Sequence, residues 1–183
     1  MIFIENEGLL RASVILPTFK KYNVQLMKVE ELQRQLEEME TYIAFKTQRN
    51  PKISKAPVGW HLAHSLKVIH SILGSLDISD PAQYRKTFSW KKELVYLTGK
   101  IPRGKARAPK KVIPEDNISE EELRDQISKT SRKITGISKL PKNAFFEHPY
   151  FGHIKRDETT KFLVIHTEHH LKIIRDVVGS KTK

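Results

Sequence analysis

Apolar residues along the chain recur at intervals of three and four, which is the period of amphipathic helices. The clearest example is the last long segment, Asp157 to Val178. Its apolar stripe contains Phe162, Leu163, Ile173 and Val177. We expect Asp157 to serve as the N-cap of this helix and Gly179 to end it.

Three other segments have the same periodicity. The first predicted helix covers Gln25 to Phe45, the second runs from Pro57 to about Leu76, and the third from Glu120 to Ile137. A capping box formed by Ser119 and Glu122 marks the start of the third. Upstream of the first, Pro17 separates a short apolar stretch, Leu9 to Leu16, for which a separate helix is one interpretation.

A connection of about 40 residues, 78–118, joins the second and third helices. Trp90, Leu94, Leu97 and Ile101 predict a short helix inside it, closed by the glycines and prolines that follow. The segment LPKNAFFEHPYFGHIKR before the last helix is predicted to be a loop, because no alternation of useful length predicts a strand. The pattern therefore predicts an all-α fold, a four-helix bundle with a long crossover that contains a short extra helix.

The length of 183 residues is typical of one domain. We expect a single helical domain over residues 1–183, with 1–20 as an N-terminal extension and 179–183 as a tail. The chain has no cysteine, which excludes a thiolate nucleophile, an iron–sulfur cluster and a cysteine-bound zinc ion. Any metal must be bound by nitrogen or oxygen atoms.

The net charge of the chain indicates which partners it attracts and says little about its fold. The formal net charge is +12, and the run Lys100 to Lys111 carries six basic residues and no acid. Such a run attracts phosphates or an anionic cosubstrate. It contains no interleaved aromatic residues, so we interpret it as a solvated loop and do not expect a nucleic-acid partner. The N-terminus lacks the basic start of a signal peptide and no window of about 18 apolar residues exists, so we expect a cytoplasmic protein that does not bind a membrane.

Histidines supply the candidate chemistry. His166 and His170 lie four residues apart within the apolar stripe of the last helix, so their rings lie one turn apart on its inward face. Two buried imidazoles need partners for their nitrogens, and a shared metal ion satisfies one nitrogen of each. Glu168 falls on the outer face, where we expect a surface charge, and no general base can be named.

A third metal ligand should come from a facing helix. Helical periodicity leaves His61 and His64 as alternatives and slightly favours His61. The remaining histidines are more typical of structural or surface positions. His169 flanks the inward stripe and His70 falls on the polar side of its helix, and we interpret both as solvated or interface residues. His148 and His153 lie in the loop that precedes the last helix, where lining the mouth of the site is one interpretation and a structural role is the favoured one.

The stretches GWHLAHSLKVI and HPYFGHIKRDETTKFLVIHTEHHLKII resemble the DinB/YfiT-like superfamily, and in particular its subgroup with an HPxFG loop before the last helix. This resemblance implies an up-down-down-up bundle, often a homodimer. It also implies a divalent metal, zinc or nickel, held by His64, His166 and His170, which favours His64 over His61. Characterised relatives include thiol-dependent transferases and isomerases. A small-molecule substrate, a low-molecular-weight thiol and metal-dependent transfer or hydrolysis are therefore what the resemblance leads us to expect.

Overall fold

The structure is a computed structural model that describes residues 8–104, 107–115 and 117–179, with side chains from residue 24 onward. The described residues are mostly helical. They form the helices α1 (Gly8–Thr41), α2 (Val58–Asp77), α3 (Trp90–Thr98), α4 (Glu120–Ile134) and α5 (Arg156–Gly179), and the strands β1 (Phe145–His148) and β2 (Gly152–Lys155).

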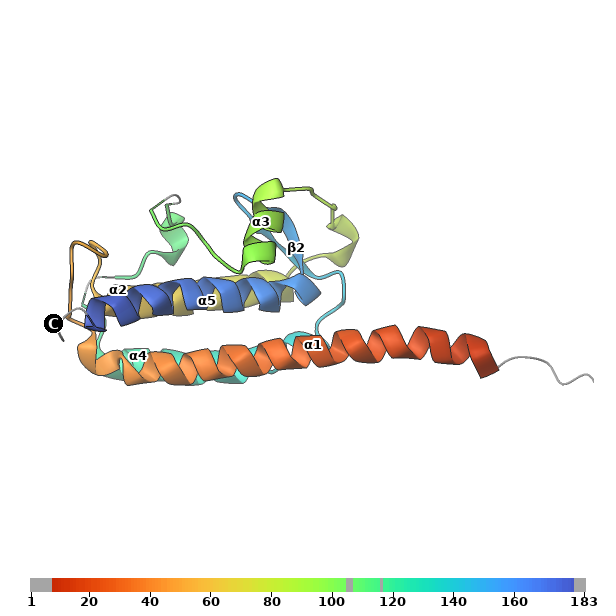
Figure 1. Cartoon of the computed structure of the whole chain (residues 1–183), viewed down its shortest axis with the longest axis horizontal. Helices are drawn as coiled ribbons and strands as arrows, with labels where there is room; N and C mark the ends of the chain where they lie inside the picture. The colour runs from red at the N-terminus through yellow and green to blue at the C-terminus, as the bar shows by residue number, and fades with distance from the viewer. Residues whose placement is uncertain (1–7, 105–106, 116, 180–183) are drawn as a thin grey trace, which may run out of the picture.

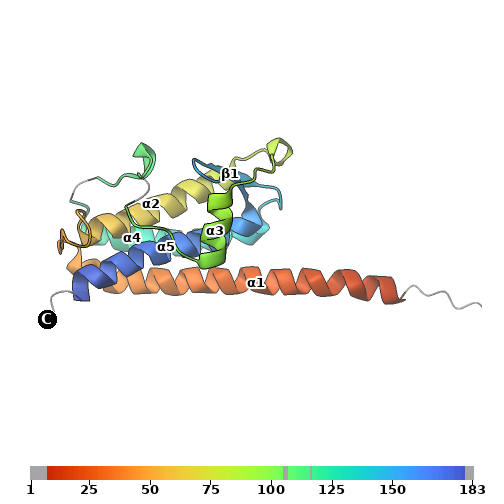
Figure 2. The same cartoon turned by 45° about the horizontal axis from the view of Figure 1, so that its top comes forward.

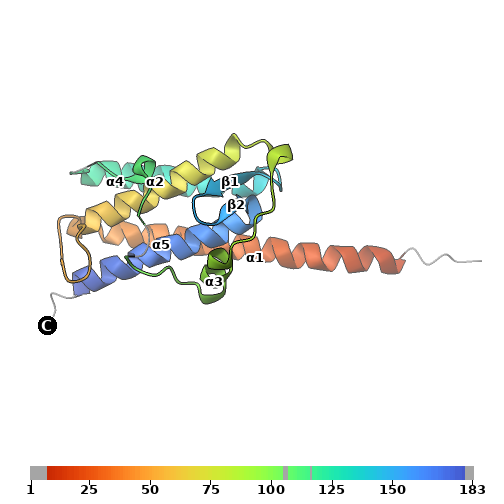
Figure 3. The same cartoon turned by 90° about the horizontal axis from the view of Figure 1, so that it is seen from above.

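The four long helices lie in two layers, with α2 and α5 in one and α1 and α4 in the other (Figure 1). Each long helix contacts its neighbour in the same layer, through the pairs α2–α5 and α1–α4, and one helix of the other layer, through the pairs α1–α5 and α2–α4. The helices α2 and α4 run in one direction and α1 and α5 in the opposite one, as a view from above shows (Figure 3). The short helix α3 and the two strands lie on the outer face of the α2–α5 layer (Figure 2).

Local sequence signals set the helix ends. Ser119 caps α4 by accepting a hydrogen bond from the backbone N–H of Glu122 at 3.0 Å, as predicted. Ser89 caps α3 in the same way through Lys92, and Gly99 ends it in the left-handed conformation with φ of 62°. Pro57 directly precedes α2, where its missing N–H costs nothing.

The core lies where the apolar faces of the long helices meet. Its largest fully buried side chains come from all four long helices, from the 3-10 turn after α1 and from β2, and they are Leu32, Leu36, Met39, Ile43, Leu62, Leu66, Ile69, Leu76, Leu123, Ile134, Ile154 and Leu163. Apart from Ile154, which lies on β2, these are inward positions of the three-and-four pattern. A polar contact adds to this packing at the surface, where Arg175 of α5 donates to both carboxylate oxygens of Glu38 on α1.

The prediction of an all-α fold was wrong in one segment. Residues Phe145–His148 pair antiparallel with Gly152–Lys155, where a loop was expected. Phe145 and Phe146 are adjacent apolar residues, and β2 has Ile154 as its one large apolar residue, so neither short strand shows the alternation that predicts a strand. Gly152 has φ of 68°, and a Cβ at this position would overlap the side chain of Thr87. The hairpin turn therefore depends on a glycine packed against the crossover.

Helix ends differ from the predictions in several places. The helix α1 ends at Thr41, before the predicted end at Phe45, and Ile43–Phe45 form a separate 3-10 turn. The helix α1 continues through Pro17, since a proline removes only one backbone donor and the surrounding turns keep theirs. Asp157 lies inside α5 and pairs with Arg156, so it is not the N-cap. The third predicted helix ends at Ile134, and Ile137 belongs to a separate 3-10 turn. Residues 1–7 of the expected extension and 180–183 of the expected tail lie outside the described residues.

Candidate metal centre

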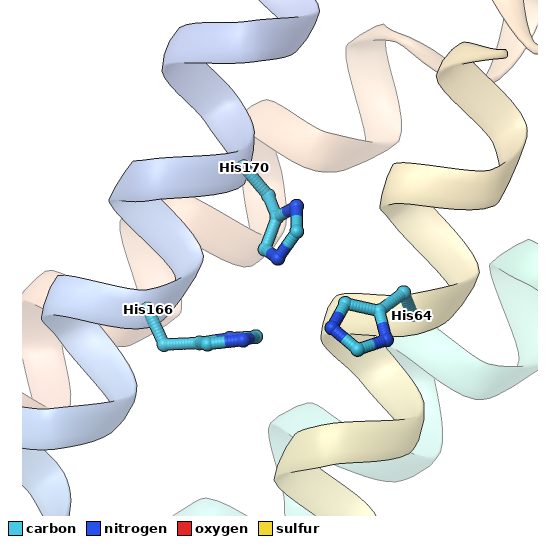
Figure 4. Close-up of side chains that lie close together, drawn as sticks. All are labelled: His64, His166 and His170. Carbon is cyan, nitrogen blue, oxygen red and sulfur yellow. The ribbon is translucent and has the colours of Figure 1, made fainter. Parts of the chain in front are cut away.

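Three histidine rings converge between α2 and α5. His64 extends from α2, and His166 and His170 extend from successive turns of α5 toward it (Figure 4). One nitrogen from each ring lies within 4.8 Å of the others, so the three could hold a metal ion. A zinc ion at about 2.1 Å from each nitrogen needs nitrogens about 3.4 Å apart, which side-chain shifts of about 1 Å would provide. The donors are the type that zinc and nickel accept.

His64 is held in one orientation by the crossover. Its side chain is only 4% exposed, and its Nδ1 donates to the carbonyl oxygen of Val112 at 2.9 Å. This hydrogen bond assigns the ring proton to Nδ1 and leaves the lone pair on Nε2. The indole of Trp60 stacks on the same ring, with centroids 4.8 Å apart and planes 12° apart. A metal-binding histidine in proteins is commonly fixed by such contacts.

His170 is fixed by a different histidine. Its Nδ1 lies 3.0 Å from Nδ1 of His61, whose Nε2 lies 2.9 Å from Oγ of Ser54. His61 thus points at a ligand of the candidate centre and away from the centre itself. Periodicity left His61 and His64 as alternatives for the third ligand. The geometry favours His64, because His64 is part of the cluster, whereas His61 contacts Nδ1 of His170.

His166 has a buried nitrogen without a partner. Among the described residues, no group forms a hydrogen bond with its Nδ1, and this atom is buried. An unsatisfied buried polar atom is destabilising by about 1–3 kcal/mol and is uncommon in a native structure. The cluster therefore leaves coordinating capacity unused, as expected of residues that fit a cation.

Burial keeps the cluster uncharged. It lowers the pKa of His64, and it lowers the pKa of both His166 and His170 well below the usual value of 6.5, with further lowering from neighbouring histidines for these two. The pKa of His61 is lowered to about 4, again mainly by burial. All four rings are thus neutral near pH 7, and neutral imidazole is the form that binds metals.

The hairpin contributes a fifth histidine near the cluster. The ring of His148 stacks on Phe151, with centroids 4.2 Å apart, and its Nδ1 accepts a hydrogen bond from the backbone N–H of Tyr150 at 3.2 Å. The ring proton is therefore on Nε2. Burial lowers the pKa of His148 to about 4, so this group is a neutral hydrogen-bond donor near pH 7. The ring of His148 lies beside that of Phe162, which is one helical turn before His166 on α5.

A cavity of about 710 Å³ opens onto these rings. The three clustered histidines, His148 and His169 line it, together with mostly apolar side chains from α2, α3, α5 and the hairpin. This volume is within the range of cavities that hold small molecules. The centre is thus accessible to a ligand, in contrast to a closed structural metal site.

The other predicted residues lie away from the cluster. Nε2 of His70 contacts Thr130 of α4 at 2.5 Å, which makes His70 an interface residue. His153 stacks on Phe145 and accepts from the backbone N–H of Arg85. Glu168 pairs with Arg175 on the outer side of α5, as predicted for a surface charge.

Sequence reasoning missed the groups that hold the centre in place. Trp60 was detectable, because it precedes His64 by four residues on one helix and must lie beside it. The roles of Val112 and His148 depend on contacts between segments distant in the sequence, which periodicity does not reveal.

Among the described residues, no helix has the length and apolar character needed to cross a membrane.

Comparison with known proteins gives one match. The profile of a family described as "Protein of unknown function (DUF1569)" matches residues 88–177, which include α3, α4, the hairpin and most of α5. The chain is similar to that family over the segment that contains His148, His166 and His170, while His64 lies outside it. No curated protein and no solved structure is similar enough to match.

Proposed function

We propose that the chain is a metal-dependent enzyme of the DinB/YfiT-like type, with a divalent transition metal, zinc or nickel, bound by His64, His166 and His170. The observation that carries this proposal is the convergence of three neutral imidazoles, one nitrogen of each within 4.8 Å of the others, at an open cavity. The opposite directions of the helix pairs α2, α4 and α1, α5 support classification as an up-down-down-up four-helix bundle.

A divalent metal held by three imidazoles supplies a Lewis acid that lowers the pKa of a water molecule or a small thiol. The protein's own residues orient the metal ligands, exclude water and donate a hydrogen bond to the substrate. Val112 and His61 hold two of the imidazoles in fixed orientation, and the apolar walls exclude water from around the reacting groups. His148 offers an Nε2–H that can donate to an electrophilic substrate without changing its own charge. With no cysteine in the chain, a thiol must arrive as a cosubstrate.

We also propose that the protein is a cytoplasmic homodimer. The helix α1 extends beyond the ends of the other long helices (Figure 1). From residue 24 onward, where its side chains are described, α1 carries large apolar side chains that are about half exposed, namely Val24, Leu26 and Met27. A second copy would cover them. Light scattering should give twice the chain mass, and Leu26→Glu with Met27→Glu should give a monomer.

The metal proposal is tested by elemental analysis of protein purified without chelators and loaded with zinc or nickel. The wild type should hold about one ion per chain, and His64→Ala, His166→Ala and His170→Ala should each lose it. His153→Ala is the matched control and should retain the ion, because this ring lies outside the cluster. A wild type that binds no ion would end the proposal.

The enzymatic part needs a separate assay. A panel of low-molecular-weight thiols is combined with small electrophiles, and metal-loaded wild type is compared with His166→Ala. We expect turnover that only the wild type supports. Full metal occupancy with equal background rates for both proteins across the panel, and for hydrolysis without thiol, would instead favour a non-catalytic metal-binding role.

A further inference from the structure

The cavity above the three histidines has two chemically different regions. Its depth is apolar, with side chains from α2, α3, the hairpin and α5, including Val68, Ile72, Val95, Phe146, Phe151 and Phe162. Apolar surface continues outward to the mouth, where Trp90 is 63% exposed and Leu94 is 50% exposed. Large apolar side chains left open to solvent around a cavity indicate a surface that a ligand covers.

Basic side chains surround the same mouth. Lys91 of α3 and three residues of the following loop, Lys100, Arg107 and Lys111, line the cavity and are exposed. Among the residues that the structure describes, Glu147 is the one acidic residue that lines it with them. Among the described residues, no acidic side chain forms an ion pair with any of these four cations, although Arg103 nearby is paired with Asp176. The mouth therefore carries uncompensated positive charge.

The histidines and the cations that line the cavity differ in exposure to solvent. His64 and His170 are buried and His166 is half-buried, whereas the four cations are exposed, so a ligand that reaches from the cations to the histidines contacts the apolar lining. A neutral apolar molecule would leave the cations unused. A small polar anion would leave the apolar walls in contact with water. Only a molecule with both properties satisfies the whole cavity.

We propose that the cavity binds an amphiphilic anion, a molecule with an aromatic or long aliphatic body and an acidic group at one end, such as an aryl or fatty carboxylate. The acidic group contacts Lys100, Arg107 and Lys111, and the body packs against the apolar walls. The opposite end of the ligand reaches His64, His166 and His170. This last point rests on the proposed function, because the ligand end next to the three histidines is the end on which a bound metal would act.

Two fluorescent probes of matched shape test the inference on the zinc-loaded full chain. Anilinonaphthalene sulfonate has an aromatic body and one anionic group, and N-phenylnaphthylamine has the same body without the charge. We expect the sulfonate to bind once per chain and about tenfold more tightly than the neutral probe at low salt, because three exposed charge contacts each contribute modestly. Added salt should reduce this preference.

Three variants assign the binding to this cavity. The triple substitution Lys100→Gln, Arg107→Gln and Lys111→Gln should weaken sulfonate binding about tenfold and leave the neutral probe unchanged. The control triple, Lys129→Gln, Lys139→Gln and Lys142→Gln, removes the same charge from exposed residues outside the cavity lining and should change neither. Ile72→Trp should fill the cavity and weaken both probes.

The outcomes separate this inference from the proposed function. A chain that holds one zinc ion but binds neither probe, or binds both equally, would overturn the inference and leave the metal proposal standing. Equal losses of sulfonate binding in the two triple variants would also overturn it, since a general charge effect would then explain the preference. Selective sulfonate binding by a chain that takes up no metal would support the amphiphile site while ending the proposed function.

Discussion

The Nδ1 atoms of His61 and His170 lie 3.0 Å apart between α2 and α5. At this distance one nitrogen donates and the other accepts. A metal bound at Nε2 of His170 requires the proton of that ring on Nδ1. His61 then accepts at Nδ1 and donates from Nε2 to Oγ of Ser54. His61 is therefore expected to orient a ligand without binding the metal.

Substitution of His61 should change metal affinity and leave stoichiometry intact. We expect His61→Leu to weaken zinc binding about 10- to 100-fold, the usual effect of losing such a partner. His61→Asn should weaken it less, because its Oδ1 can occupy the position of Nδ1 and accept from His170. Competition with a chromophoric chelator measures both values. Unchanged affinity in His61→Leu, or complete loss of the ion, would contradict this role.

Acid should destabilise the metal-free protein in a defined range. Burial lowers the pKa of His61 and of His148 from 6.5 to about 4. Between these values the unfolded chain binds protons that the folded chain does not, so the free energy of unfolding falls as the pH falls from about 6.5 toward 4. Each ring should contribute a loss of about 2 kcal/mol by pH 4.5. Urea unfolding at several pH values measures the slope.

The variant with both His61→Asn and His148→Asn is the control for this slope. Asparagine has no ionisable proton in this range, so the variant should lose less stability on acidification even if it is less stable at pH 7. An equal slope in the two proteins would assign the acid sensitivity to other groups and contradict the effect of burial on these two rings.

The limits of sequence reasoning lie in the contacts between elements. The spacing of His166 and His170 was sufficient to predict that they share a face, because helix geometry alone determines it. It was insufficient to choose between His61 and His64, since both lie on buried faces of α2 and only the position of α5 and Val112 separates their roles. The hairpin that presents His148 was missed because its strands are short. The cavity was missed because four segments distant in sequence form it.

His166 should lower the stability of the metal-free protein. Its buried Nδ1 has no partner among the described residues, and leucine would remove the unsatisfied atom at similar volume. We expect metal-free His166→Leu to be about 1 kcal/mol more stable than the wild type. Zinc at about 100 times its dissociation constant should stabilise the wild type by about 2.7 kcal/mol and should not stabilise the variant. Urea unfolding with and without zinc measures both; a less stable variant without zinc would contradict this cost.

The turn that presents His148 should depend on Gly152 more than a helix end depends on Gly99. Both glycines have positive φ, 68° and 62°, so alanine carries the same backbone cost of about 1 kcal/mol at either position. A Cβ at Gly99 would meet no atom within 4 Å, whereas one at Gly152 would overlap Thr87. Gly99→Ala should thus cost about 1 kcal/mol and Gly152→Ala about 3 kcal/mol, measured by urea unfolding. Adding Thr87→Gly to Gly152→Ala removes the overlap and should cost less than the sum of the two single changes. Strict additivity would show that the overlap with Thr87 is not the cause.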